Sequence, residues 1–204
     1  MTTIPQPANP KVEQILAGAR QVFFEHGFGA ATTDMVQQAA GVSKSTVYSY
    51  FPSKEVLFAA VIRAECEKLV DRVHGERLSA HTSRETLTRI GVRILETVLD
   101  PSILSLFRII IAEAPRFPEL GRVIFEAGAS PMQSELARYL VEAGWRLELS
   151  VDDPDTAARH FVGMAMHDLQ LRCLLGFRAP PDGEEIRRIV GIAVDDFLRA
   201  YARR

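Results

Sequence analysis

The chain has 204 residues, a formal net charge of −2 at pH 7 and 47% hydrophobic residues. This length allows one domain or a small and a larger one, and the apolar share is ample for a packed core rather than a disordered chain. No run of about 18 apolar residues occurs, and the polar first residues do not resemble a secretory signal, so we expect a cytoplasmic protein without a membrane span.

The first predicted element is a helix that begins at Asn9-Pro10, an N-cap followed by proline at the first helical position. Apolar residues then recur at spacings of three and four from Val12 to Phe23, which is the pattern of one buried helical stripe. Gly27 is expected to end this helix.

Residues 32–58, TTDMVQQAAGVSKSTVYSYFPSKEVLF, predict a helix-turn-helix. Gly41 ends a short helix in a tight turn, and Ser43 is placed to cap a second helix over about residues 44–50. Val47 falls on the inner side of that helix. On or near its outer side lie Lys44, Ser45, Thr46, Tyr48 and Ser49. Hydroxyls, an ammonium group and a tyrosine suit phosphates and base edges, so this side is a candidate DNA-binding surface.

The same stretch resembles the TetR family of one-component transcriptional regulators. The shared residues are Phe24-Glu25-His26-Gly27-Phe28, Thr32-Thr33, Ala40-Gly41-Val42-Ser43-Lys44 and Tyr48-Ser49-Tyr50-Phe51-Pro52-Ser53-Lys54-Glu55-Val56-Leu57-Phe58. They cover roughly a quarter of the chain. Two positions depart from the pattern: Gln37 replaces the usual Ala, and Ser45 replaces a frequent Gly.

The resemblance implies an all-α protein of about nine helices, with a three-helix N-terminal helix-turn-helix domain and a helical C-terminal domain for ligand binding and dimerisation. It further implies that the second helix of the motif enters the major groove of a palindromic double-stranded operator. The expected DNA-binding residues are Thr33, Ser43, Lys44, Ser45, Thr46, Tyr48, Ser49, Tyr50 and Lys54. Thr33 and Lys54, at the starts of the flanking helices, are expected to hold phosphates.

Charge is an objection to DNA binding, because nucleic-acid binders usually carry a basic face. In residues 1–58, four basic residues (Lys11, Arg20, Lys44, Lys54) are balanced by four acidic ones (Glu13, Glu25, Asp34, Glu55). Lys44 and Lys54 nevertheless flank the recognition helix. The N-terminal arm is poor in Lys and Arg, so we expect a modest salt dependence of DNA binding.

The rest of the chain also reads as helical, with predicted domains at 9–58 for DNA binding and 83–204 for effector binding and dimerisation. A helix over 54–74 links them, and residues 75–83 are expected to form a loop. Further helices are expected at about 84–99, 101–114, 118–144 (kinked or split by Gly128 and Pro131), 154–175 and 183–202, with 146–153 as a connector. Residues 106–120 are similar to a stretch in one group of TetR-family C-terminal domains.

The last two helices favour a homodimer, because apolar residues cover most of their circumference and a helix of this kind must be buried on nearly all sides. The expected interface residues are Phe161, Leu171, Leu174, Val190, Val194 and Phe197. A sequestered core helix in a monomer is the alternative. Two-fold symmetry also matches the requirement of a helix-turn-helix that reads a palindrome.

The family resemblance implies a small hydrophobic effector in the C-terminal domain, bound in an apolar chamber with a few polar groups. The expected ligand-binding residues are Phe107, Arg108, Ile111, Phe125, Met132, Met164 and His167. For each of them taken singly, a structural role in the core or at the surface is the alternative.

Enzyme signatures are absent from the sequence: it has no glycine-rich phosphate loop, no nucleophile elbow and no metal-ligand cluster, so no catalytic residue, metal or cofactor is expected. Cys66 and Cys173 are expected to be free thiols, with a redox role as the alternative. The resemblance to the TetR family therefore implies a repressor that is released from its operator by the effector. An activator or a ligand-independent DNA-binding dimer stays open, and a small helical enzyme is a remote alternative.

Overall fold

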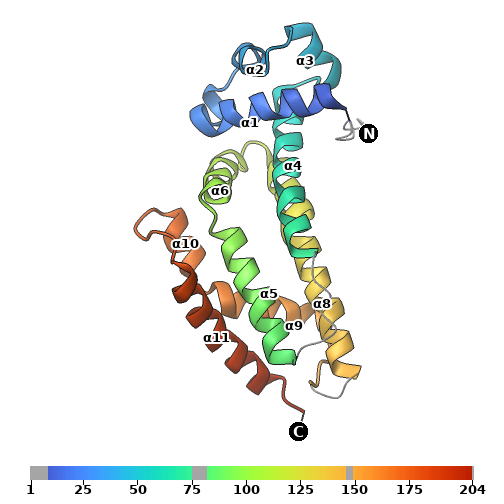
Figure 1. Ribbon diagram of the computed structural model, residues 1–204. Coiled ribbons are helices and arrows are strands. Elements are labelled where there is room, and N and C mark those ends of the chain that lie inside the picture. The colour runs from blue at the N-terminus through green and yellow to red at the C-terminus, as the bar shows by residue number, and fades with distance from the viewer. Residues whose placement is uncertain (1–8, 75–81, 146–148, 204) are drawn as a thin grey trace. The chain divides into compact units, whose positions relative to one another are not determined.

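The computed structural model describes residues 9–74, 82–145 and 149–203, and these are almost entirely helical (Figure 1). The helices are α1 (Pro10–Ala30), α2 (Thr33–Ala40), α3 (Lys44–Tyr50), α4 (Lys54–His74), α5 (Ser83–Val98), α6 (Pro101–Glu113), α7 (Pro118–Ile124), the π-helix η2 (Phe125–Ala129), α8 (Ser130–Trp145), α9 (Pro154–Met166), α10 (Leu169–Leu174) and α11 (Gly183–Ala200). Within these residues the β contacts amount to one isolated bridge, Leu149–Ala202. The predicted all-α class is confirmed.

The chain divides into two compact units, and it passes through each of them twice. The first unit comprises residues 1–68 and 105–127, and the second comprises 69–104 and 128–204. Most of α6 and all of α7 therefore pack with the helix-turn-helix, although the predicted effector domain 83–204 included them. The N-terminal arm before residue 9 and most of the predicted loop at 75–83 lie outside the described residues.

Aromatic rings form the centre of the first unit. The Phe23 and Phe58 rings lie 4.7 Å apart, Phe28 and Phe58 lie 5.1 Å apart, and Phe117 of the 105–127 segment meets Phe28 edge-on at 5.3 Å. The α1 helix does not end at Gly27 as expected. It continues to Ala30 across a kink in which Gly27 takes φ 73°, a conformation that glycine adopts without a steric penalty.

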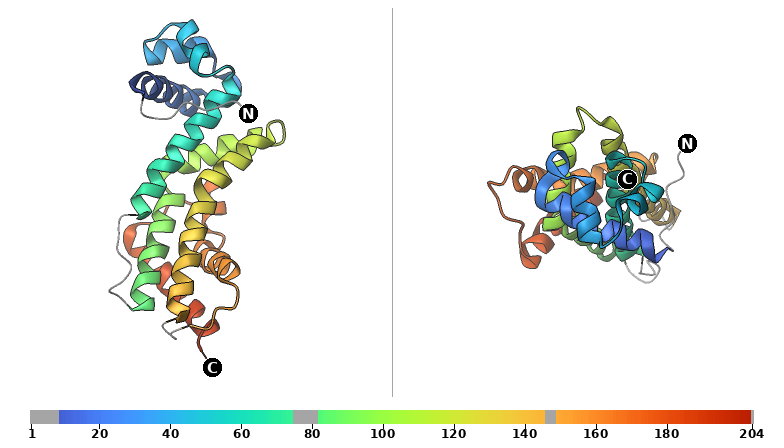
Figure 2. Two further views of the ribbon diagram at one scale, coloured as in Figure 1. Left: turned by 90° about the vertical axis from the view of Figure 1, so that its right-hand side faces the viewer. Right: turned by 90° about the horizontal axis from the view of Figure 1, so that it is seen from above.

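In the second unit α9 contacts α5, α8 and α11 (Figures 1 and 2). Asp153 caps α9 as predicted, since its carboxylate accepts from the Thr156 N–H at 3.0 Å. The predicted single helix over 154–175 is wrong: His167, at φ 45° and ψ −135°, separates α9 from α10. The split expected in 118–144 is present, and the π-helix η2 connects α7 to α8.

The remaining structural expectations concern membranes, metals and thiols. None of the described helices combines the length and apolar character that crossing a membrane requires. The described residues also contain no group of three or more His, Cys, Asp or Glu side chains able to hold a metal ion. Cys66 and Cys173 are buried, and burial raises the pKa of the Cys66 thiol to about 11. Cys66 is therefore a neutral thiol at pH 7.

Candidate nucleic-acid interface

Local capping shapes the helix-turn-helix. The Thr32 hydroxyl accepts from the Met35 N–H at 3.2 Å and begins α2, and Gly41, at φ 61°, ends it in the left-handed conformation. Ser43 caps α3 as predicted, with its hydroxyl accepting from the Thr46 N–H at 3.1 Å. Val47 is completely buried beneath α3, which fixes the side of the helix that is turned outward.

The outer side of α3 carries short hydrogen-bonding groups and one aromatic ring. Lys44, Ser45, Tyr48 and Ser49 are exposed, and Thr46 is half-buried. The Ser43 hydroxyl lies 2.9 Å from that of Ser45 and 2.7 Å from that of Thr46. Ser49 donates to the Thr46 carbonyl at 2.8 Å. This surface offers several hydroxyls and one ammonium group to a ligand.

Residues in the first turn of α2 contact two side chains of α3, Lys44 and Tyr48. The Lys44 ammonium lies 2.8 Å from the Asp34 carboxylate, and the Tyr48 hydroxyl lies 3.2 Å from the Thr33 hydroxyl. The hydrogen bond to Asp34 raises the pKa of Lys44, so Lys44 stays charged at neutral pH. Asp34 is absent from the predicted site residues, because no spacing rule connects residues on either side of the turn.

Two predicted DNA-binding residues have other partners. The Lys54 ammonium donates to the carbonyls of Phe28 (2.8 Å), Gly29 (3.3 Å) and Ala31 (3.1 Å), and it lies 4.5 Å from the centre of the Phe28 ring. These three bonds use all its donors, so Lys54 caps the end of α1 in this structure, and its expected phosphate contact stays a prediction that would require at least one of these bonds to break. Tyr50 is half-buried, and its hydroxyl accepts from the Asn9 amide at 3.2 Å.

The predicted effector residues do not come from one compact unit. Phe107, Arg108, Ile111 and Phe125 belong to the first unit, whereas Met132, Met164 and His167 belong to the second. Ile111 and Phe125 are 57% and 56% exposed, and Met132 packs against the core of the second unit. His167 is exposed and lies 3.0 Å from the Asp168 carboxylate.

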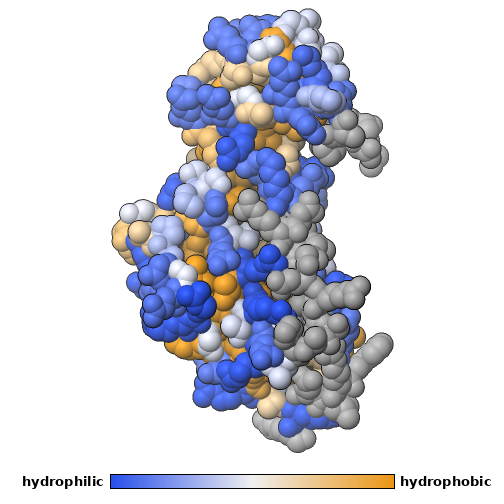
Figure 3. Space-filling model, in the orientation of Figure 1, coloured by the Kyte–Doolittle hydropathy of each residue, from blue (hydrophilic) through white to orange (hydrophobic). Residues whose placement is uncertain are grey.

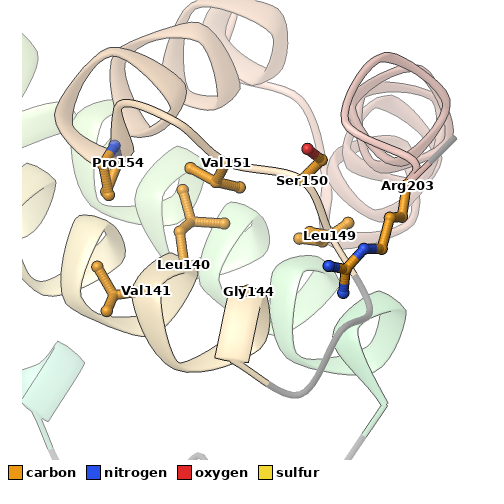
Figure 4. A pocket seen from close by; sticks show the side chains of 8 residues that line it. All are labelled: Leu140, Val141, Gly144, Leu149, Ser150, Val151, Pro154 and Arg203. Carbon is orange, nitrogen blue, oxygen red and sulfur yellow. The ribbon is translucent and has the colours of Figure 1, made fainter.

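A pocket of about 350 Å³ lies in the second unit, where the end of α8 faces residues 149–154 (Figure 4). Leu140, Leu149 and Val151 contribute apolar lining, and the Arg203 side chain reaches toward Leu149 from the end of the chain. None of the seven predicted effector residues lines this pocket.

Most of the predicted dimer-interface residues are core residues of one chain. Phe161, Val190, Val194 and Phe197 are completely buried in the second unit, so they belong to the core of one chain and leave no side-chain surface for a second subunit. Leu174 is half-buried, and its expected subunit contact stays a prediction. The α11 face that carries Val190 and Val194 packs on α5 and α9 instead. Leu171, in contrast, is 57% exposed.

Of the large apolar side chains that reach the surface in the described part of the second unit, Val141 lies on α8 and the other five lie on α9 to α11 and their connection. Those five are Met164, Leu171, Leu175, Phe177 and Ile192. On the face drawn in Figure 3, orange hydrophobic surface lies beside α10, and blue hydrophilic surface covers much of α11. We call these five residues the exposed apolar set.

Comparisons with known proteins agree with this arrangement. A family model described as bacterial regulatory proteins, tetR family, matches residues 15–61, and a model described as the AefR-like transcriptional repressor, C-terminal domain, matches residues 85–203. The chain belongs to the TetR family. It is a TetR-type DNA-binding transcriptional regulator.

Among its relatives, the HTH-type transcriptional repressor AcnR of Corynebacterium efficiens is 35% identical over 68 residues, which are 33% of this chain and 36% of that protein. The chain thus matches about a third of the length of this relative. A TetR-family regulator from Mesorhizobium loti has a TM-score of 0.87 at 26% identity and covers 98% of this chain and 100% of its own. The flavonoid-responsive regulator FrrA has a TM-score of 0.83 at 38% identity and covers 95% and 98%.

Proposed function

We propose that this TetR-family regulator is a homodimeric repressor that reads a palindromic operator with α3. The exposed face of α3 carries this proposal, because Lys44, Ser45 and Tyr48 point outward while Val47 is buried below them. Thr33, Thr46 and Ser49 complete the surface, with Ser43 as the cap. Hydroxyls that both donate and accept suit base edges and phosphate oxygens. Lys54 and Tyr50 form hydrogen bonds at the two ends of α1 and are left out of the contact set.

Dimerisation is proposed through the exposed apolar set rather than through the buried side chains. Leu171, Leu175 and Ile192 are 57%, 66% and 56% exposed, and an apolar surface of this kind is stabilised when a second copy removes it from water. Two copies related by two-fold symmetry present two α3 helices to successive major-groove segments.

Release by a small hydrophobic effector is the third part of the proposal. The 38% identical FrrA is described as flavonoid-responsive, which supports a small-molecule effector, and the matched C-terminal family model describes a repressor, which supports repression. An effector that binds the released form better than the DNA-bound form weakens DNA binding by the factor with which DNA weakens effector binding. An activator would make the same DNA contacts. Transcription from a reporter promoter, measured with and without the protein, distinguishes repression from activation.

The substitution Tyr48→Ala tests the DNA-binding surface. Tyr48 is 44% exposed, and its packing contributes little to the core. The ligand is a DNA duplex that the wild-type protein selects from a random library. We expect Tyr48→Ala to weaken binding to this duplex by about 1–3 kcal/mol, because one good recognition contact contributes about that much free energy. Gel shifts give the affinity, and melting curves should stay close to wild type. Unchanged affinity would remove α3 from the interface.

A further inference from the structure

The recognition surface contains an acidic residue that has no evident place on a DNA-binding protein. Asp34 lies in the first turn of α2, is exposed, and approaches the Lys44 ammonium to 2.8 Å. Lys44 and Tyr48 lie one turn apart on the same side of α3, and Tyr48 meets Thr33, the neighbour of Asp34. The first turn of α2 thus fixes two side chains of α3 through adjacent residues.

The charges of residues 9–58 show how little positive charge this surface offers. Arg20 pairs with Glu65 at 2.8 Å, and the Lys54 ammonium is surrounded by three carbonyls. Lys11 lies at the start of α1 and donates to the neutral side chain of Gln14. Lys44 is the cation on the outer side of α3, and a carboxylate at 2.8 Å compensates its charge.

Compensating that charge has a defined physical consequence. Affinity for DNA of any sequence depends mainly on phosphates neutralised by cations, and it falls with salt in proportion to their number. Hydrogen bonds to base edges, in contrast, distinguish one sequence from another. A carboxylate beside the ammonium weakens the first contribution and does not touch the hydroxyls of Ser45, Thr46 and Ser49, which can still provide the second through their remaining donor and acceptor sites.

We propose that Asp34 is a specificity-determining residue: by pairing with Lys44 it suppresses binding to DNA of unrelated sequence. This inference rests on the proposed role of α3 in DNA binding. A surface ion pair that only connects α2 to α3 is the other explanation. Such a pair changes stability slightly and leaves sequence discrimination unchanged.

The test uses Asp34→Asn in the full chain. Asparagine keeps an oxygen that accepts from Lys44 but removes the charge. Glu25→Gln is the matched control, because Glu25 is an exposed acidic residue of α1 and its replacement changes the net charge equally. Fluorescence anisotropy would measure binding to a duplex selected by the wild type and to a random-sequence duplex pool, over a range of salt concentrations.

For Asp34→Asn we expect roughly tenfold tighter binding to the random pool at low salt. The slope of log affinity against log salt should steepen by about 0.9 for each additional phosphate that the variant neutralises. The ratio of selected-duplex to random-pool affinity should fall. Adding Lys44→Gln to Asp34→Asn should return the random-pool affinity and slope to wild-type values, because the released charge is that of Lys44.

Equal effects of Asp34→Asn and Glu25→Gln would overturn the inference, since net charge alone would then explain them. A steeper slope that Lys44→Gln does not reverse would overturn it as well. Failure of the proposed recognition surface is a different result: Tyr48→Ala would then leave the affinity for the selected duplex unchanged. Melting curves of all variants establish that each one is folded.

Discussion

The surface of α3 in the first unit and the surface of α10, α11 and their connection in the second unit differ in the side chains that they expose. In the first unit, the surface of α3 presents hydroxyl groups and the ammonium of Lys44, which is paired with Asp34. The large exposed side chain of α3 is Tyr48, and it also carries a hydroxyl. In the second unit Leu171, Leu175 and Phe177 are 57%, 66% and 68% exposed and carry no polar atom. Hydroxyls keep their hydrogen bonds in water or on DNA, whereas the leucines and the phenylalanine gain free energy only when something apolar covers them. This difference fits the two partners proposed above, which are DNA for α3 and a second copy of the chain for the exposed apolar set.

The largest expected effect separates the interior of the second unit from its exterior. Val194→Glu places a carboxylate at a completely buried position of α11, without a partner, and should destabilise the second unit by about 3–5 kcal/mol. Urea unfolding followed by circular dichroism would measure the loss.

Leu171→Glu is the matched control on the exterior. Because Leu171 is 57% exposed, the same carboxylate stays hydrated there, and the free energy of unfolding of the subunit should change by about 0.5 kcal/mol or less. Sedimentation at micromolar concentration should show more monomer than for the wild type. A well-folded Val194→Glu protein that merely dissociates would contradict the division into interior and exterior.

The next effect concerns how closely helices approach in the first unit. A Cβ atom on Gly18 would lie 2.6 Å from the Ala40 backbone nitrogen, and backbone at the end of α2 does not move as a side chain does. Gly18→Ala should therefore displace α2 from α1 and destabilise the first unit by about 1–3 kcal/mol. Melting curves measure the loss, and weaker DNA binding should accompany it, because α2 positions α3. A wild-type melting temperature would contradict this close approach.

The carboxylate of Glu65 and its two basic partners add a smaller and pH-dependent contribution to the stability of the first unit. Glu65 of α4 is 8% exposed and accepts from Arg20 and Lys68, each at 2.8 Å. Burial raises the pKa of its carboxyl, but the two hydrogen bonds outweigh that effect, and the pKa lies below its usual range. Glu65→Gln should cost about 1–3 kcal/mol at pH 7.

The stabilisation from Glu65 and its two basic partners depends on pH in a predictable direction. A carboxyl whose pKa is lowered by folding stabilises the folded chain above its unfolded pKa, which is about 4.3 for Glu, and this stabilisation is lost as the pH falls through the folded pKa. The difference in free energy of unfolding between wild type and Glu65→Gln should therefore be constant near neutral pH and shrink below about pH 4. A difference independent of pH would show that lost packing, and not charge, is responsible.

The smallest expected effect has the opposite sign and lies on the exterior of the second unit. Gly191 sits in α11, and a Cβ atom there would meet nothing within 4 Å. Gly191→Ala should stabilise the second unit by about 0.5–1 kcal/mol, because alanine restricts the unfolded chain and favours helix. Thermal melting compares it directly with Gly18→Ala. Destabilisation in the dimer but not in the monomer would place Gly191 in the subunit interface.

Capping and periodicity made much of the fold predictable from the sequence. Asn9, Ser43 and Asp153 cap the helices that the sequence assigned to them, and Val47 is buried where the motif placed it. These features depend on hydrogen bonds and spacings within about four residues, so a single sequence contains them. The break at His167 was missed, because its cause is a backbone conformation that histidine rarely adopts.

Only the tertiary structure decided which surfaces are free. The apolar face of α11 was evident in the sequence, but the sequence did not show that α5 and α9 of the same chain cover Val190 and Val194. From the sequence, Lys54 is expected to bind phosphate. The structure shows that its ammonium donates to backbone carbonyls 23 to 26 residues earlier in the chain. The same holds for Asp34, since its partner Lys44 lies on the other side of a turn. The sequence by itself determined the helices, their caps and the outward side of α3, because these follow from local interactions. Contacts between residues far apart in the sequence depend on how the helices pack. A residue pattern shows which side of a helix is apolar or charged, but it does not show which element packs against that side.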